Sequence, residues 1–138
     1  MTGIFFILLA LACFYDVRDR RIPNLLVYSG MLLGVGSHLV FGIFGLLAGG
    51  ALLFTLSFVL ESSLGDYSIG GGDIKLMAMI GAFLGPQAAL IISLVTAAVA
   101  VCILIESRFM REKVLIPFAP FMAFITVLYL GAKLYAAS

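Results

Sequence analysis

The sequence predicts an all-α, polytopic membrane protein with six transmembrane helices, of which the fourth is short. Hydrophobic residues make up 64% of the 138 residues and charged residues only 11%, a composition far outside that of soluble globular proteins. A chain of this length leaves no room for a second domain, so residues 1–138 are expected to form a single transmembrane domain. Lys and Arg total 8 against 7 Asp and Glu, which gives no indication of a nucleic-acid partner, and membrane lipid is the expected surrounding.

The first three spans are expected at residues 3–15, 25–40 and 44–60. Three arginines, between residues 18 and 21, follow the first span, and the positive-inside rule places them in the cytoplasm and the N-terminus outside. Pro23 comes next, where a residue without an N–H ends one helix or begins another. His38, near the outer end of the second span, is interpreted as a loop or interface residue because no other ligand-type residue accompanies it.

Residues 74–105 are long for one crossing and short for two, since a full crossing needs about 20 residues. Gly85 and Pro86 supply a turn inside this segment. Two crossings also keep the following basic loop, residues 106–113, on the cytoplasmic side. We therefore expect two helices here, the first of them short. The last span is expected at residues 114–133, so that both termini lie outside.

This topology places two carboxylates on the same side of the membrane, Asp16 at the exit of the first helix and Asp73 at the entrance of the fourth. Two aspartates that share a proton can hydrolyse an amide, because the ionised one activates a water while the other protonates the carbonyl oxygen. Gly70, Gly71 and Gly72 precede Asp73. They remove side chains from its approach and open dihedral angles that other residues avoid, so that this loop admits a peptide.

The other acidic residues lie in polar stretches where ionisation costs little, and they are interpreted as solvated loop charges. These are Asp19, Glu61, Asp66, Glu106 and Glu112. A non-catalytic explanation of the glycine segment also stays open, namely a tight turn between helices in which Asp73 caps a helix. Cys13 and Cys102 stand alone in apolar runs, with no CxxC motif and no clustered histidine, so no metal site is expected.

Three motifs occur in order along nearly the whole chain, and together they are more specific than any one alone. They are Tyr15-Asp16 with Arg18 and Ile22-Pro23-Asn24, then Gly70-Gly71-Gly72-Asp73-Ile74-Lys75-Leu76 with Ala78 and Gly81-Ala82, and then Ile116-Pro117-Phe118-Ala119-Pro120-Phe121. This set resembles the type IV prepilin peptidases, which are GxGD-type aspartyl proteases of the bacterial inner membrane related to archaeal preflagellin peptidases. The resemblance implies that Asp16 and Asp73 are the catalytic pair. The remaining motif positions that it marks as substrate-binding or site-shaping are Gly70, Gly71, Gly72, Lys75, Pro23, Asn24, Pro117 and Pro120.

The family removes the short cytoplasmic leader of prepilins or pseudopilins, and it cuts after a glycine at the cytoplasmic edge of the apolar helix. The resemblance therefore implies a multi-pass inner-membrane enzyme without a cofactor, whose active site lies at the cytoplasmic face. Larger members carry an extra N-terminal region, usually with paired CxxC motifs, that methylates the new N-terminus. This chain has neither that length nor those cysteines, so it looks like a compact stand-alone peptidase similar to those of tight-adherence pilus systems. Ala119 stands where glycine is common in the last motif.

Two other function classes remain open. Tyr-Asp and Gly-x-Gly-Asp also mark the presenilin and signal-peptide-peptidase proteases, but their third motif is Pro-Ala-Leu, which Phe118-Ala119-Pro120 does not reproduce. A small ion or solute carrier would use intramembrane charges as a pathway. The carrier hypothesis favours polar groups near the middle of the bilayer, whereas the carboxylates here cluster at one face.

Overall fold

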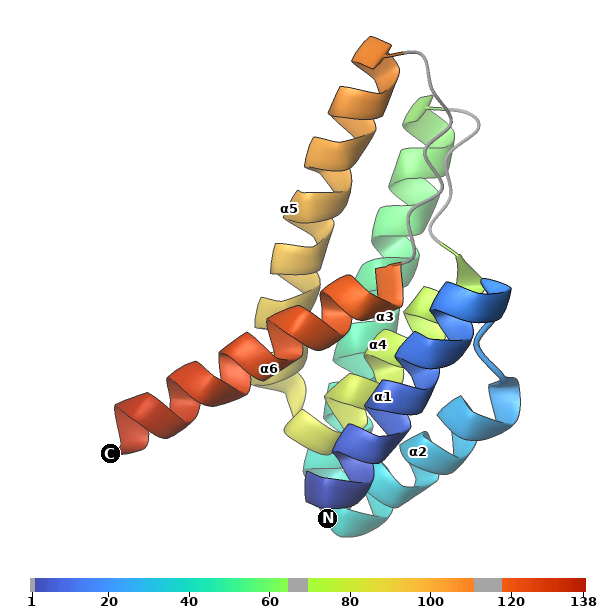
Figure 1. Cartoon of the computed structure of the whole chain (residues 1–138). Coiled ribbons are helices and arrows are strands. Elements are labelled where there is room, and N and C mark those ends of the chain that lie inside the picture. Colours follow the sequence, from blue (N-terminus) through green and yellow to red (C-terminus); the bar gives the residue numbers. More distant parts are fainter. Residues whose placement is uncertain (1, 65–69, 111–117) are drawn as a thin grey trace.

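The part of the chain that the structure describes folds into six α-helices, as the sequence predicts. The computed structural model describes residues 2–64, 70–110 and 118–138, and this described part contains no strand (Figure 1). The helices are α1 (Thr2–Asp19), α2 (Asn24–Ser37), α3 (Leu39–Leu64), α4 (Gly71–Leu84), α5 (Pro86–Met110) and α6 (Phe118–Ala137). Both termini lie at the end of the molecule away from the start of α4 (Figure 1). The predicted all-α fold with six helices is confirmed.

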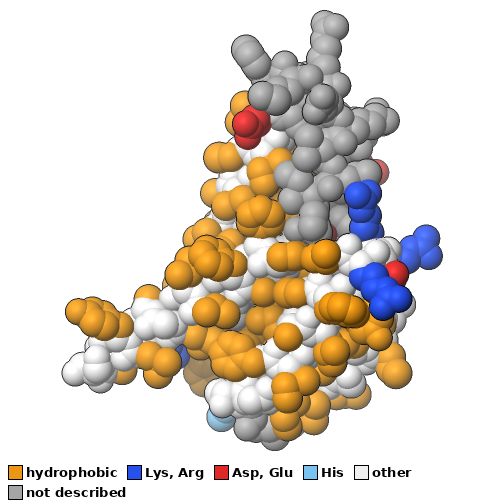
Figure 2. Space-filling model, in the orientation of Figure 1, with side chains coloured by type: hydrophobic (Ala, Val, Ile, Leu, Met, Phe, Trp, Pro, Cys, Tyr) orange, Lys and Arg blue, Asp and Glu red, His pale blue; other side chains and the backbone are white. Residues whose placement is uncertain are grey.

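The surface of the molecule is that of a membrane protein. Within the described residues, three helices are long and apolar enough to cross a bilayer, at Leu39–Ser63, Pro86–Glu106 and Phe118–Ala137. Hydrophobic side chains cover much of the face in Figure 2, and most of the Lys and Arg side chains that it shows gather beside the end of α1. Apolar groups in lipid need no covering by protein, because the hydrocarbon core is as apolar as they are.

The fourth helix is short, as predicted, and it is the most buried element of the fold. Its 14 residues span about 21 Å at 1.5 Å per residue, less than the roughly 30 Å of a bilayer core. Residues 76–82 are all buried, and α4 packs against α2, α3 and α5. A short helix is tolerated at this depth because neighbouring helices, rather than lipid, surround its ends.

Glycines on α3 and α4 bring these two helices into backbone contact. A Cβ atom added to Gly45 would collide with the backbone carbonyl of Gly81, and one added to Gly81 would collide with that of Gly45. A Cβ at Gly49 would lie 2.7 Å from the carbonyl oxygen of Met77. Small residues of this kind let helix backbones approach closely where packing, not the hydrophobic effect, drives association. This contact fixes the height of α4 along α3.

The predicted turn between the fourth and fifth helices is present. Gly85 joins α4 to α5 with φ of 87°, a left-handed conformation that favours glycine. Its N–H donates to the carbonyl of Gly81 at 2.8 Å, and α5 begins directly afterwards at Pro86. Proline suits the first position of a helix because its fixed φ is already helical.

Several helix boundaries differ from those expected. The first helix continues to Asp19, so Asp16 lies inside its last turn and not beyond it. The third helix begins at Leu39, after a break at the exposed His38, and it continues through Glu61, where a polar loop was expected. Charged and hydroxyl side chains at a helix end remain exposed to solvent, so the hydropathy pattern marks the membrane edge and not the helix end.

The long helices rise beyond the short ones. In Figure 1 the upper ends of α3 and α5 extend well past the end of α1 and the start of α4. The end of α1 and the start of α4 therefore lie beside the shafts of the long helices and not at their tips.

Candidate active site

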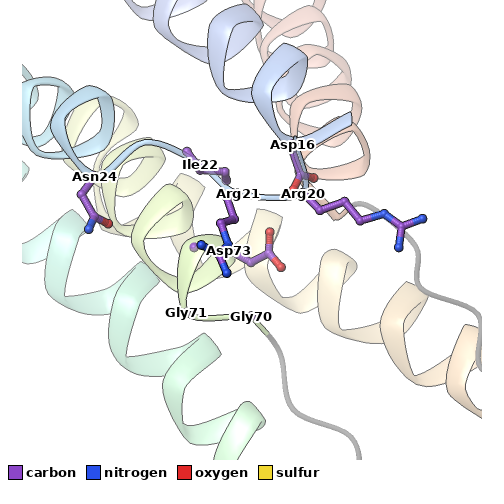
Figure 3. A pocket seen from close by; sticks show the side chains of 9 residues that line it. Asp16, Arg20, Arg21, Ile22, Asn24, Gly70, Gly71 and Asp73 are labelled. Carbon is purple, nitrogen blue, oxygen red and sulfur yellow. The ribbon is translucent and has the colours of Figure 1, made fainter. Parts of the chain in front are cut away.

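A single pocket receives both candidate catalytic carboxylates. It has a volume of about 350 Å³. Its lining residues are Asp16, Arg20, Arg21, Ile22, Asn24, Gly70, Gly71, Gly72 and Asp73. Figure 3 shows the carboxyl groups of Asp16 and Asp73 directed into the same space, one from the end of α1 and the other from the start of α4. Residues 57 positions apart in the chain thus share one site, an outcome that the topology argument expected.

Asp16 is held by the first turn of α6. Its side chain is only 8% exposed, and its Oδ2 accepts a hydrogen bond of 3.1 Å from the backbone N–H of Ala119. Ala119 is the second residue of α6, where the backbone N–H groups have no partner within the helix. The carboxyl group of Asp16 on α1 therefore accepts a hydrogen bond from the start of α6, and this bond orients its Oδ2 atom.

Asp73 does not cap its own helix. It is the third residue of α4, and the residue before the helix is Gly70, which makes no side-chain capping bond. The backbone N–H of Asp73 instead donates to the carbonyl of Gly70 at 2.9 Å. The half-buried carboxyl group of Asp73 is left to face the pocket. The capping explanation of this segment loses its basis.

The triple glycine acts differently from the expected loop. Gly71 and Gly72 already belong to α4, and Gly85 is the glycine with positive φ in the described residues. The three glycines therefore do not adopt dihedrals closed to other residues. A steric role is supported at Gly70, where a Cβ would lie 3.3 Å from Oδ2 of Asp73. A Cβ at Gly72 would make an ordinary contact, 3.7 Å from Ile22, and one at Gly71 would meet nothing within 4 Å.

Of the two motif residues Pro23 and Asn24 between α1 and α2, Asn24 lies at the pocket. Asn24, the first residue of α2, lines the pocket, and its Oδ1 accepts a hydrogen bond of 2.9 Å from the Nζ of Lys75. Pro23 precedes α2 with φ of −60°, and its carbonyl accepts from the N–H of Leu26 at 3.1 Å. Pro23 is thus the N-terminal boundary of α2 and not a wall of the pocket.

The proline motif of the last helix is described only in part. Pro120 is the third residue of α6 and is half-buried, but it does not line the pocket. Pro117 lies outside the described residues, and so does Asp66. Because Pro120 occupies the first turn, where an N–H would have no helical partner, it begins the helix without disrupting it.

Four residues at the site were assigned no role by the sequence argument. Arg20 and Arg21 were interpreted only as markers of the cytoplasmic side, yet both line the pocket. Arg20 has φ of 51°, a left-handed conformation that ends α1 sharply and that a non-glycine residue seldom adopts. Ile22 forms a wall next to Gly72. Ala119 was noted only as a departure from glycine, and no local pattern reveals that its N–H reaches Asp16.

The pocket brings together two carboxyl groups, which are capable of acid–base chemistry. Among the residues that the structure describes, no group of three or more His, Cys, Asp and Glu side chains converges. The nearest thiol, that of Cys13, donates to the carbonyl of Ala119 at 3.6 Å. Two carboxyl groups in one pocket, one of them hydrogen-bonded, can exchange protons with a water and a peptide.

Comparison with known proteins adds a family to this geometry. The sequence model described as the type IV leader peptidase family matches residues 3–131. The chain is 32% identical over 119 residues to a prepilin leader peptidase/N-methyltransferase of Burkholderia pseudomallei (strain K96243), a match that covers 78% of this chain and 38% of that protein. It is 31% identical over 120 residues to the protein of the same name from Aeromonas salmonicida (strain A449), covering 80% and 41%.

The match to these relatives is partial. The chain spans about two fifths of the length of the curated relatives that it matches. No solved structure matches significantly.

Proposed function

This chain belongs to the type IV leader peptidase family, and we propose that it is an aspartic endopeptidase that removes the short leader of a type IV prepilin or pseudopilin. The observation that carries this proposal is the placement of Asp16 and Asp73 in one pocket. Asp16 belongs to the Tyr-Asp motif and lies on α1, and Asp73 belongs to the Gly-x-Gly-Asp motif and lies on α4. The names of the two relatives also include N-methyltransferase activity, which we do not extend to this chain.

The geometry supports hydrolysis without a covalent intermediate. One carboxylate takes a proton from a water while that water attacks the carbonyl carbon of the scissile peptide. The other carboxyl group gives its proton to the carbonyl oxygen, which yields a tetrahedral diol. When the diol collapses, the proton taken from water passes to the leaving nitrogen and the C–N bond breaks. A hydroxyl group of the diol returns its proton to the other carboxylate, so the pair regains its shared proton.

The surroundings of the pair favour a peptide at the cytoplasmic side of the inner membrane. Arg20 and Arg21 are exposed at the pocket, and Arg18 is exposed one turn or less away on α1. By the positive-inside rule these arginines support a cytoplasmic location for the site. The side-chain-free surface of Gly70 and Gly71 leaves room for an extended backbone, which a glycine before the substrate's apolar helix would supply. We propose prepilins of the tight-adherence kind as the substrates.

The proposal is tested by the depth of the cleaved bond. The purified enzyme is reconstituted in liposomes with single-span model prepilins whose glycine junction lies at the cytoplasmic edge or two helical turns deeper, a shift of about 11 Å. Cleavage of the edge substrate alone, after the glycine, is the expected result. Equal cleavage of both would instead indicate proteolysis within the membrane, as in the presenilin-like alternative. Failure to cleave either substrate would refute the peptidase proposal.

A further inference from the structure

The helices that carry the two aspartates are linked, at the pocket, through the start of α2. The backbones of α1 and α4 make little direct contact, whereas α2 and α6 each pack against both. The rings of Phe5 and Phe83 do join α1 to α4, with centroids 5.0 Å apart, but these residues lie at the ends of their helices away from Asp16 and Asp73. At the pocket, the spacing of the two carboxylates therefore depends on the hydrogen bond of Asp16 to α6 and on how α2 is fixed to α1 and α4.

The link from Asp16 to α2 is short and conformationally restricted. Four residues separate the end of α1 at Asp19 from the start of α2 at Asn24. Arg20 continues the helical hydrogen bonding, donating its N–H to the carbonyl of Asp16 at 3.0 Å, and then turns the chain with φ of 51°. Pro23 holds the other end with φ of −60° because its ring fixes that angle. The position of Asn24 is thereby tied to that of Asp16.

Besides the packing of α2 on α4 further along, the ammonium group of Lys75 links the start of α2 to the start of α4 beside Asp73. Lys75 follows Asp73 by two residues, and its Nζ donates to Oδ1 of Asn24 at 2.9 Å. The same Nζ lies 5.6 Å from the ring centroid of Tyr28, within the range of a cation–π contact. Asn24 and Tyr28 are four residues apart and so present one face of α2 to this lysine.

We infer that Lys75 is a positioning residue, which clamps the start of α2 to α4 and so sets the spacing of Asp16 and Asp73. The inference rests on the proposed peptidase function. Lys75 does not line the pocket, and its ammonium group is engaged by Asn24 and Tyr28. A partly exposed hydrogen bond adds little to folding stability, whereas a small displacement of a catalytic group lowers the rate strongly. Removal of the clamp should therefore slow turnover more than it affects folding or substrate binding.

The test compares variants of the purified, reconstituted enzyme on a model prepilin with its glycine junction at the cytoplasmic edge. Lys75→Met keeps the length of the side chain but removes the charge and the donor, and we expect kcat to fall about tenfold with KM little changed. Lys75→Arg still donates to Asn24 and stacks on Tyr28, so it should retain most of the activity. Tyr28→Phe keeps the ring and should match the wild type, as should Lys133→Met on exposed α6, which controls for the loss of one lysine.

A double-mutant cycle separates the clamp from independent effects. Asn24→Leu should lower kcat about as much as Lys75→Met, and the double variant should be no slower than either single variant because both remove the same bond. Full activity of Lys75→Met, multiplicative losses in the double variant, or a change confined to KM would overturn the inference. Loss of folded Lys75→Met and Lys75→Arg alike, seen by size-exclusion chromatography, would also overturn it, because the residue would then be structural. A wild-type enzyme that cleaves no prepilin would refute the proposed function itself, a result distinct from these.

Discussion

From residue 76 to residue 82, α4 is buried against α2, α3 and α5, whereas its first five residues are partly exposed at the pocket. The buried part is fixed by backbone contact between Gly81 and Gly45 of α3. The pocket end is fixed by single polar contacts, such as the bond from Lys75 to Asn24. Packing thus determines where the helix stands, and a few polar groups determine where its carboxylate points. Substitutions at the two ends should therefore affect different properties of the protein.

The largest expected effect is a loss of activity when Asp73, at the pocket end of α4, or Asp16, on α1, is replaced. Asp16→Asn and Asp73→Asn should each lower kcat about a thousandfold or more, because an amide neither takes a proton from water nor returns one. Both variants should fold, since the carbonyl oxygen of an asparagine at position 16 still accepts from Ala119. Cleavage of a model prepilin by purified protein measures the loss. Asp19→Asn, at the exposed end of α1, is the matched control, and near-normal cleavage by either site variant would contradict the aspartic mechanism.

The next effect is on stability, from the buried end. Gly45→Leu should destabilise the protein by about 3 kcal/mol or more, because even its Cβ collides with the carbonyl of Gly81 and cannot move away without shifting backbone. Thermal unfolding followed by size-exclusion chromatography in detergent would show this. Gly131→Leu on α6 is the control, since nothing lies within 4 Å of a Cβ there. Equal stability of the two variants would mean that the α3 and α4 backbones are not in contact.

A smaller effect is expected where the start of α6 holds Asp16. Ala119→Pro removes the N–H that bonds Oδ2 of Asp16, in the first turn of α6, where proline is tolerated because the N–H has no helical partner. We expect kcat to fall about tenfold, the equivalent of one lost hydrogen bond. Ala119→Ser keeps the N–H and should retain activity. If the proline variant is folded and cleaves at the normal rate, this bond does not orient the carboxyl group.

The smallest effects should separate the motif glycines from one another. A Cβ at Gly71 meets nothing within 4 Å, whereas one at Gly70 would lie 3.3 Å from Oδ2 of Asp73. Gly71→Ala should therefore change kcat/KM by less than about twofold, and Gly70→Ala should lower it about threefold because the carboxyl group has to shift slightly. Parallel progress curves on one model prepilin would resolve the difference. A larger loss of kcat/KM in Gly71→Ala than in Gly70→Ala would contradict this prediction.

The sequence by itself determined the membrane fold and the two candidate carboxylates. Apolar runs of sufficient length can only be helices in lipid, because every backbone polar group must find a partner within its own segment. Gly85 and Pro86 likewise divide a run of apolar residues, since their backbone conformations are locally restricted. Asp16 and Asp73 stood out because charges at the edges of such runs are costly and few.

Only the tertiary structure decided how those carboxylates are held. The N–H of Ala119 lies 103 residues from Asp16 in the chain, and Lys75 lies 51 residues from Asn24. Hydropathy and turn patterns describe neighbours in sequence, so they carry no information about which side chains meet across such separations. The meeting of Gly45 and Gly81 sets the height of α4, and with it the pocket to which Arg20, Arg21 and Ile22 contribute. These residues gained their place at the site from packing of whole helices, which no local pattern expresses.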